Sequence, residues 1–321
     1  MTEPQDPLLP ARPGERWVVR HRLPNGAATD LIGWLDQLAP GHLHLSSATG
    51  ESHVVERANV LAARRAPAAP GGPPPERVSA DELERHALPG WLALHEPLGE
   101  WTLRAGGGFT GRANSCHAVG DPGLPVAEAA ELIRRFAAAH DIPPRAQVVE
   151  GGPPERALRQ LGWVDGYVPT EMLAVRLADL LGTAARDPRV RLTEQLEVPW
   201  WHAYAESRPH DADPALLRLI LAGNPPRVFA GVPVAGGRLT AIGRGHLSGS
   251  WLGYAAVWTR PEHRRQGWAS RVMIALGHWA ARRGARYAYL QVASANSTAL
   301  EAYERMGFRR HHRYLYLEPP A

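Results

Sequence analysis

The sequence contains no lysine: all 36 of its Lys and Arg residues are arginine. This absence excludes catalysis through a Schiff-base lysine. There is also only one cysteine, Cys116. A single cysteine excludes an internal disulfide framework and a metal site made only of thiolates, and it fits a reducing cytoplasm.

Long hydrophobic runs are absent too. No apolar run approaches the roughly 20 residues that span a bilayer. Residues 1–13 are polar and proline-rich, without the apolar centre of a signal peptide. We therefore expect a cytoplasmic protein with no membrane segment. At 321 residues and 44% hydrophobic, the chain is long enough for two domains or three small ones.

The charge is unevenly distributed. The whole chain has a net charge of +4, whereas the segment from Arg260 to Arg313 holds eleven Arg and three Glu, a net charge of +8. A basic segment of this kind suits a phosphorylated cofactor or a nucleic acid. A solvated arginine-rich face is the alternative interpretation.

The first part of the chain, residues 14–66, has the pattern of a small all-β unit. Short apolar-centred runs over 16–22, 30–37, 42–46 and 51–56 are separated by turn residues. This spacing predicts a small SH3-like β-barrel. A linker over 67–78 follows, because residues 66–75 are rich in Pro, Gly and Ala.

Two segments of mixed α/β pattern come next, 79–180 and 189–321. In the first we expect a short helix from Ser79 and the elements at 101–105, 126–140, 147–149, 155–161 and 167–177. In the second we expect helices at 200–206, 214–221, 267–283 and 297–306, and strands at 190–192, 227–234, 239–247, 250–259, 286–292 and 308–317.

The strongest chemical signal lies in the second of these segments. A predicted strand ends in a Pro-containing loop, and Arg264-x-x-Gly267-x-Ala269 then opens a long helix. Gly267 permits close approach of a ligand to the backbone. The amides from Arg265 to Ser270 stand at a helix N-terminus, which favours anions. The pattern predicts a pyrophosphate cradle; an ordinary strand-to-helix turn is the alternative.

A second motif follows at the next helix. Asn296 precedes this helix, and Tyr303-x-x-x-Gly307-Phe308 spans its end. Together with the arginine loop, this motif resembles the GNAT superfamily of N-acetyltransferases, which use acetyl-CoA. The resemblance covers residues 189–321.

The resemblance implies an α/β (α+β) architecture, the GNAT acyltransferase fold, preceded by the small barrel. The three-part layout and the run 106–115 resemble an actinobacterial subgroup of that superfamily. The resemblance to the GNAT superfamily also implies direct acetyl transfer to an amine in a ternary complex. The residues it assigns to acetyl-CoA are Val257, Trp258, Thr259, Arg264, Arg265, Gln266, Gly267, Trp268, Ala269, Ser270 and Asn296.

The resemblance also gives the residues near the reacting atoms a role. Backbone amides from Val257 to Thr259 would orient the acetyl carbonyl and stabilise the oxyanion. Tyr303 matches the tyrosine that protonates the leaving CoA thiolate; a packed helix tyrosine is the alternative. Asn296 is explained equally well as a helix N-cap.

The general base is not evident from the sequence. In some members of the superfamily a Glu lies on the strand before the loop, but the stretch Trp251–Ala256 has no carboxylate. Tyr254, Glu206 or a chain of waters could serve instead. Glu206 fits a solvated helix face better.

The first α/β segment contains a motif similar to the tyrosine motif of the second. Leu158-x-x-x-Gly162-Trp163 parallels the tyrosine motif, at a similar distance after a helix and a strand. This predicts that 79–180 is a degenerate GNAT-like copy in tandem with the catalytic one. It has leucine in place of the tyrosine and lacks the arginine loop, so it should not catalyse transfer. A chance likeness of two α/β units is the alternative.

We therefore predict an N-acetyltransferase whose partners are acetyl-CoA and an amine of a small molecule or a protein. Fifteen histidines are present, but neighbours such as His311 and His312 on one strand should point to opposite faces, so no metal site is expected. We expect neither membrane nor nucleic-acid binding, and the oligomeric state stays open. The alternative function is a nucleic-acid- or protein-binding module with vestigial acetyl-CoA binding.

Overall fold

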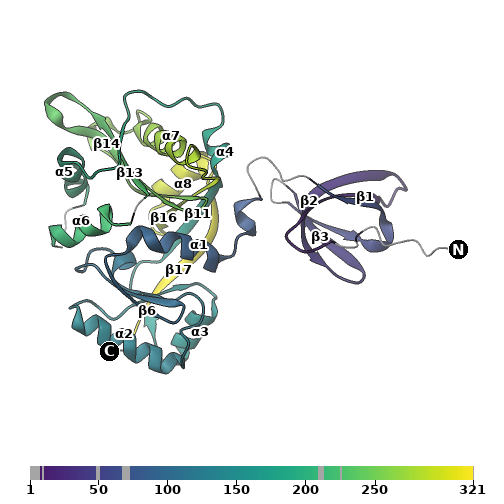
Figure 1. Cartoon of the computed structure of the whole chain (residues 1–321), viewed down its shortest axis with the longest axis horizontal. Helices are drawn as coiled ribbons and strands as arrows, with labels where there is room; N and C mark the ends of the chain where they lie inside the picture. The colour runs from purple at the N-terminus through teal and green to yellow at the C-terminus, as the bar shows by residue number, and fades with distance from the viewer. Residues whose placement is uncertain are drawn as a thin grey trace. The chain divides into compact units, whose positions relative to one another are not determined.

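The computed structural model describes residue 8 and residues 11–47, 51–66, 73–208, 213–224 and 226–320. The chain divides into two compact units, Met1–Arg77 and Val78–Ala321. Most of the proline-rich stretch predicted as a linker, residues 67–72, lies outside the described residues. Each unit has its own sheet (Figure 1).

The first unit is a five-stranded antiparallel sheet in the order β4-β3-β2-β1-β5. Its interior is made of alternate residues of the strands, among them Trp17, Val19, Leu43 and Leu45. The four strands predicted from the sequence are confirmed. The fifth strand was missed, because it buries no side chain completely and has no clear alternation. The bounds are β1 (Arg16–Arg22), β2 (Ala28–Leu38), β3 (His42–Ser46), β4 (Ser52–Glu56) and β5 (Val60–Arg65).

The second unit is built on a 12-stranded sheet. Its order is β12-β13-β14-β15-β16-β11-β17-β9-β8-β7-β6, and β10 pairs with β17 off this path. The strands are β6 (Leu94–Leu98), β7 (Trp101–Ala105), β8 (Cys116–His117), β9 (Ala146–Val149), β10 (Val164–Asp165), β11 (Thr170–Arg176), β12 (Arg191–Thr193), β13 (Arg227–Pro233), β14 (Leu239–Ser248), β15 (Trp251–Thr259), β16 (Tyr287–Ala293) and β17 (Arg309–Glu318).

Helices pack on this sheet at both ends. Figure 1 shows α7 and α8 at one end of the unit and α2 and α3 at the other. The helices predicted from the sequence are confirmed, with ends shifted by at most two residues. They are α1 (Ala80–Ala87), α2 (Val126–Ala139), α3 (Pro153–Gln160), α5 (Val198–Ser207), α6 (Pro214–Ala222), α7 (Trp268–Ala281) and α8 (Ser297–Arg305). A further helix, α4 (Leu177–Leu181), was not predicted from the sequence.

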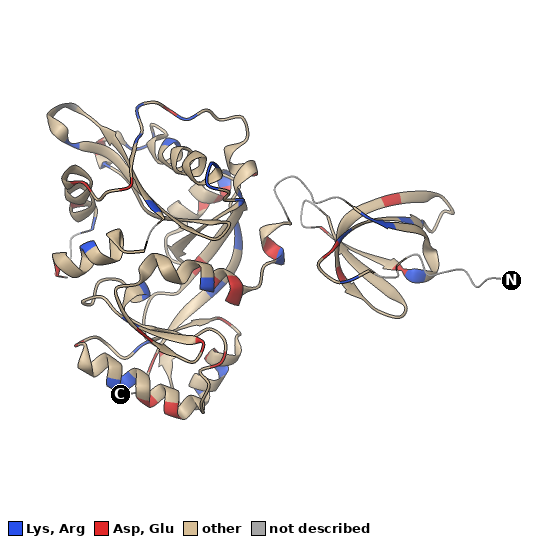
Figure 2. Ribbon diagram, in the orientation of Figure 1, with Lys and Arg blue, Asp and Glu red and all other residues tan. Residues whose placement is uncertain are grey.

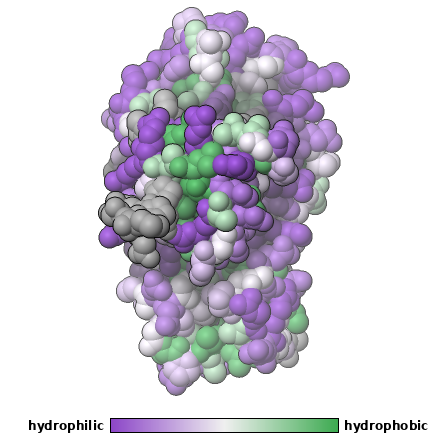
Figure 3. Space-filling model, turned by 90° about the vertical axis from the view of Figure 1, so that its right-hand side faces the viewer, coloured by the Kyte–Doolittle hydropathy of each residue, from purple (hydrophilic) through white to green (hydrophobic). Residues whose placement is uncertain are grey.

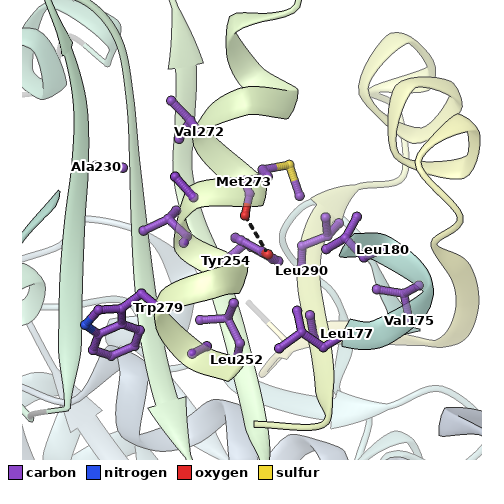
Figure 4. Close-up of a cluster of buried hydrophobic side chains, with 14 of the residues drawn as sticks. Val175, Leu177, Leu180, Ala230, Leu252, Tyr254, Val272, Met273, Trp279 and Leu290 are labelled. Carbon is purple, nitrogen blue, oxygen red and sulfur yellow. Dashed lines mark hydrogen bonds between the residues drawn. The ribbon is translucent and has the colours of Figure 1, made fainter. Parts of the chain in front are cut away.

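The main core lies beneath α7. Its apolar stripe buries Val272, Leu276 and Trp279 at helical spacing against the neighbouring strands (Figure 4). Gly243 on β14 permits this packing, because a Cβ there would lie 2.6 Å from Val272 Cγ1. The long helix is therefore held firmly over the sheet, with its N-terminus next to the end of β15.

The two α/β segments follow one plan. Each has a parallel pair of strands joined by a helix, β8-α2-β9 and β15-α7-β16, and each continues into a further helix. The segments also exchange strands. β11, the last strand of the first segment, lies between β16 and β17, whereas β17 extends to pair with β9 and β10. Segments 79–180 and 189–321 therefore share one continuous sheet.

The surface of the molecule is mixed in character. On the face presented in Figure 3, hydrophobic residues form small groups between hydrophilic ones. Among the described residues, no helix is both long enough and apolar enough to cross a membrane.

The pair His311 and His312 differs from the sequence-based expectation. Opposite faces were predicted, but their Nδ1 atoms lie 2.8 Å apart. The cause is a bulge, since β17 pairs with Met172 through His312 and with Leu173 through Arg310, which leaves His311 unmatched in the register. Among the described residues, no group of three or more His, Cys, Asp or Glu side chains is arranged to hold a metal.

His312 belongs to a buried network around Glu84. The carboxylate of Glu84 contacts His312 Nε2 at 3.0 Å and His117 Nε2 at 3.2 Å, and it accepts from Gln147 Nε2 at 2.8 Å. Burial alone would raise the pKa of Glu84, but hydrogen bonds to the two histidines outweigh it and lower that pKa from 4.5 to about 2. Burial lowers the pKa of His117.

This network predicts an acid-sensitive fold. The pKa values of both His117 and Glu84 are lowered in the folded protein, so on acidification the unfolded chain protonates these two residues first, near 6.5 and 4.5. The free energy of unfolding should therefore fall from about pH 6.5 downward, with a Glu84 contribution on the order of 3 kcal/mol lost by about pH 2. Urea unfolding measured across this pH range should show that the free energy of unfolding of Glu84→Gln falls less steeply toward acid pH than that of the wild type. Glu96→Gln, at an exposed position, is the control and should keep the wild-type pH dependence. The same wild-type pH dependence in Glu84→Gln would contradict the role given to the network.

Candidate functional site

β15 and β16 run side by side and then part. Their parallel pairing extends from Trp251 and Tyr287 to Tyr254 and Leu290, and these two fully described strands form no pairs beyond that point. The end of β15 still pairs with β14 on its other side. Backbone groups that face away from β14 therefore open onto a gap, where they are available to a ligand.

A bulge shapes the end of β15 at this gap. Ile242 pairs with Trp258 and Arg244 with Ala255, so two residues, Ala256 and Val257, stand opposite one residue of β14. Ala256 has φ = 53°, in the left-handed region that residues other than glycine rarely adopt. Strained residues of this kind often occur at functional sites, and Ala256 and Val257 line a narrow cavity.

The predicted phosphate cradle has the backbone geometry of an anion site. Arg265 and Gly267 have φ values of 60° and 76°, two left-handed residues in close succession. Tight turns that combine right- and left-handed residues are a common source of anion-binding backbone concavities. α7 then begins with no side-chain cap at Gly267, so the first amides of the helix face outward with their dipole.

The side chains around this turn are tied to one another. Arg264 Nε donates to the carbonyl of Thr259 at 3.3 Å, and an Arg271 nitrogen donates to the carbonyl of Gln266 at 2.6 Å. The guanidinium groups of Arg189 and Arg271 lie 4.7 and 4.8 Å from the centroid of the Trp268 ring. The turn is therefore preorganised by its own residues.

Ion pairs account for much of the basic segment identified in the sequence. Basic and acidic residues are interspersed over the second unit (Figure 2). Six of the eleven arginines pair with carboxylates: Arg260, Arg271, Arg283, Arg305, Arg310 and Arg313. Within the described part of the chain, Arg264 and Arg265 have no such partner. Arg282, Arg286 and Arg309 also lack a carboxylate partner among the described residues, so what distinguishes Arg264 and Arg265 is their place in the turn before α7.

Tyr303 lies on α8 beside the gap. It lines a narrow cavity of about 60 Å³ together with Val257 of β15 and Gln291 of β16. Burial raises the pKa of Tyr303, and the nearby Arg208 partly opposes this. The hydroxyl therefore keeps its proton at neutral pH, as a general acid requires.

Neither protein side chain considered as the general base is placed for that role. Tyr254 is buried, and its hydroxyl donates to the carbonyl of Met273 at 2.9 Å (Figure 4). Burial raises its pKa, so the hydroxyl stays protonated and is not available to accept a proton at neutral pH. Glu206 holds Arg260 through both carboxylate oxygens and is absent from the lining of the narrow cavity.

Asn296 is the N-cap of α8. Its side-chain oxygen accepts from the backbone N–H of Ala299 at 3.2 Å. This contact accounts for the presence of Asn at the position. Of the residues predicted to hold acetyl-CoA, Val257 shares the narrow cavity with Tyr303, whereas the turn residues 264–270 and Asn296 stand outside its lining.

A wider cavity of about 600 Å³ adjoins the narrow one. The two cavities share Arg112 and Arg208 in their linings. Most of the other lining residues of the wide cavity come from the first α/β segment, within 107–112 and 167–170. That segment therefore helps to build the site, although it lacks the motif of the second.

The glycine-rich loop in this wall is held by one buried side chain. Asn114 Oδ1 accepts from the N–H groups of Gly106 and Gly108 at 2.8 and 2.9 Å. Its Nδ2 donates to the carbonyls of Phe109 and Thr110 at 2.6 and 3.0 Å. All four hydrogen bonds of the amide are used on the loop, which keeps Thr110 in a left-handed conformation with φ = 59°.

The matching region of the first segment has a different chemistry. Leu158, at the position that corresponds to Tyr303, is fully buried in a hydrophobic cluster. The loop before α2 is occupied by carboxylates: Asp121 N donates to Glu100 at 2.7 Å, and Gly123 N donates to Asp121 at 2.8 Å. These negative groups fill the place where the second segment has arginines, which disfavours a phosphate ligand there.

Several lining residues were not predicted from the sequence. Arg112 belongs to the run 106–115, which was noted only as a mark of a subgroup. Nothing in the sequence distinguishes Arg208 or Gln291 from other surface or strand residues. Their position depends on the strand exchange, which brings the two segments to one cavity.

Comparison with known proteins identifies this arrangement. Residues 80–317 match the family model described as "Probable histone acetyltransferase Rv0428c C-terminal". The chain is 28% identical over 319 residues to "Probable histone acetyltransferase Rv0428c" from Mycobacterium tuberculosis, which covers 95% of this chain and 94% of that relative. It also resembles the structure of a GCN5-related N-acetyltransferase from Kribbella flavida, with a TM-score of 0.52 and 21% identity over 76% of this chain and 97% of that one.

The parted strands and the turn before α7 belong to a fold that this chain shares with the GCN5-related N-acetyltransferases, and the family model that matches residues 80–317 is that of an acetyltransferase. The resemblance seen in the motifs is thereby confirmed. More particularly, the chain belongs to the family of the Rv0428c C-terminal model, which matches about three quarters of its length.

Proposed function

We propose that this chain transfers the acetyl group of acetyl-CoA directly to an amine, in a complex that holds both substrates. The observation that carries the proposal is the gap between β15 and β16, which Tyr303 lines and which lies near the uncapped head of α7. Acetyl-CoA would need both features, the gap for its acetyl thioester and the head of α7 for its pyrophosphate. The alternative, a nucleic-acid- or protein-binding module, needs neither.

The turn residues 264–270 would bind the pyrophosphate of acetyl-CoA through backbone amides and the charges of Arg264 and Arg265. Backbone amides from Val257 to Thr259 would orient the acetyl carbonyl. Asn296, whose oxygen is used in its cap, would contact the cofactor through its free amide nitrogen. The fit rests on the left-handed turn and the missing cap described above.

The chemistry is acyl transfer from sulfur to nitrogen. The neutral amine attacks the thioester carbon, the carbonyl oxygen becomes an oxyanion, and the C–S bond then breaks. Tyr303 would give its proton to the departing thiolate. The proton lost by the amine would pass to water in the wide cavity, because Tyr254 and Glu206 are engaged elsewhere.

The first α/β segment, 79–180, would be a degenerate copy of the second, 189–321. Its common plan with the second segment and its buried Leu158 support this proposal. Titration calorimetry should therefore find one acetyl-CoA bound per chain. Two equal sites would contradict it.

We also propose that the protein works in the cytoplasm and that residues 14–66 form an SH3-like barrel. The antiparallel order of the first sheet is compatible with such a barrel. The proposal of enzymatic function is tested most simply by thermal shift. Acetyl-CoA should raise the midpoint of unfolding, and duplex DNA should not; the reverse result would favour a binding module.

A further inference from the structure

The path of the acceptor amine is set by the two cavities. The amine must reach the narrow cavity, where Tyr303 and the end of β15 lie. The wide cavity is the adjoining space that can hold the rest of a small acceptor, and its volume of about 600 Å³ is in the usual range for small-molecule sites. Arg112 and Arg208 line both spaces. The part of the acceptor next to its amine therefore lies beside two guanidinium groups.

Arg112 is a charged group held within the protein without a carboxylate. Its Nε donates to the hydroxyl of Tyr314 at 3.0 Å, and its guanidinium lies 4.7 Å from the centre of the Trp91 ring. No carboxylate in the described ranges lies within ion-pair distance. Burial by itself lowers the pKa of Arg112, but the hydroxyls of Tyr314 and Tyr316 outweigh it and raise that pKa. The group stays cationic, and an unpaired cation in such a place favours an anionic ligand.

Arg208 adds a second positive charge at the end of α5. Its side chain is exposed and has no carboxylate partner among the described residues. Neither cavity is lined by a described Asp or Glu. The field in the site is therefore positive on the side where the acceptor enters, which repels a cationic ligand.

Part of the lining of the wide cavity is aromatic. Phe109, Tyr167 and Tyr316 line it, and the rings of Tyr167 and Tyr316 meet edge to face at 5.3 Å. These rings offer apolar surface to the body of a ligand. The site thus combines three regions: an aromatic pocket, a pair of guanidinium groups, and the gap in which the amine reacts.

We infer that the acceptor is a small amine that carries an oxyanion, such as a carboxylate, close to its amino group and an apolar or aromatic body beyond it. A free amino acid with a bulky side chain has this layout. A lysine within a basic peptide does not, because its neighbours are cations and its own chain lacks an anion. This inference rests on the proposed acetyl transfer and names the substrate class of the same site.

The test compares amines that differ only in the anion. L-Phenylalanine and L-leucine are assayed against their carboxamides and their phosphonate analogues, with a basic histone-tail peptide as a further arm. Release of the CoA thiol from acetyl-CoA is followed. We expect kcat/KM for the carboxylates to exceed that for the carboxamides by about 10- to 100-fold, since a charged hydrogen bond is lost. A preference for the phosphonates over the carboxylates would assign the oxyanion to a phosphate-type group.

Arg112→Gln should remove the discrimination. KM for the carboxylates should rise by about 10- to 100-fold, while the carboxamides should change little, because they never used the charge. The matched control is Arg282→Gln, an exposed arginine at the far end of α7, which should keep the preference. Folding of each variant is checked through its affinity for acetyl-CoA, which Arg112 does not contact in this account.

The outcomes separate the inference from the proposed function. If acetyl-CoA binds and the carboxamides or the histone-tail peptide are equal or better acceptors, the inference is wrong and acetyl transfer stands. If acetyl-CoA binds but no amine turns over, calorimetry on the CoA complex decides: the carboxylates should bind more tightly than their carboxamides, and equal binding overturns the inference. If acetyl-CoA does not bind at all, the proposed function itself fails.

Discussion

Replacing both loop arginines, Arg264→Ala together with Arg265→Ala, is expected to weaken acetyl-CoA binding more than any other pair of surface changes. Each charged hydrogen bond lost should cost about 1.5–3 kcal/mol. The backbone cradle at Gly267 and the head of α7 would remain, so some affinity should persist. Titration calorimetry with acetyl-CoA measures the loss directly.

A matched control removes two arginines at the other end of the same helix. Arg282 and Arg286 are exposed and follow the last turn of α7, so Arg282→Ala with Arg286→Ala lowers the net charge equally. This control should bind acetyl-CoA almost as the wild type does. Equal affinity in the folded loop variant and in the wild type would remove the assignment of the turn to the pyrophosphate.

Tyr303→Phe is expected to reduce kcat by about ten- to a hundred-fold. General-acid catalysis typically contributes 10²–10⁴-fold, and the low end applies because a thiolate is already a fair leaving group. The ring keeps its edge-to-face contact with Phe308 at 6.0 Å, so packing is preserved. The affinity for acetyl-CoA should barely change, because the lost interaction is made mainly in the transition state.

The measurement is steady-state turnover under conditions where chemistry limits the rate. Tyr287→Phe is a suitable control, because this tyrosine stacks on Trp251 outside both cavities. It should turn over at the wild-type rate. If Tyr303→Phe does so as well, Tyr303 is a packing residue and the thiolate takes its proton from water.

Much of the fold follows from local sequence pattern. The apolar stripe of α7 and the alternation of strands such as β1 were sufficient to place these elements. β8 and β10 were missed, because two-residue strands carry no period. β6 was missed as well, because its first four residues are all exposed and give no alternation. The bulge at His311 was missed as well, since register depends on the partner strand and not on the strand itself.

The sequence indicated only the part of the candidate site that we propose for the cofactor. The turn around Gly267 is local, so its residues stand together in the sequence. The part of the site that we propose for the acceptor could not be predicted. Arg112 and Tyr303 line the same cavity only because strands β11 and β17 join the two segments into one sheet. Pairing between residues so far apart in the chain leaves no periodic signal, and a single sequence does not show which strand will be the neighbour.

The central claim is that one gap in this protein moves an acetyl group from CoA to an amine. It is tested most directly with acetyl-CoA labelled in the acetyl group, incubated with the protein and a mixture of carboxylated amines, while free CoA thiol and labelled amide are measured together. Direct transfer should release both in equal amounts and leave no label on the protein. Release of thiol without labelled amide, or label bound covalently to the chain, would contradict direct transfer at this site.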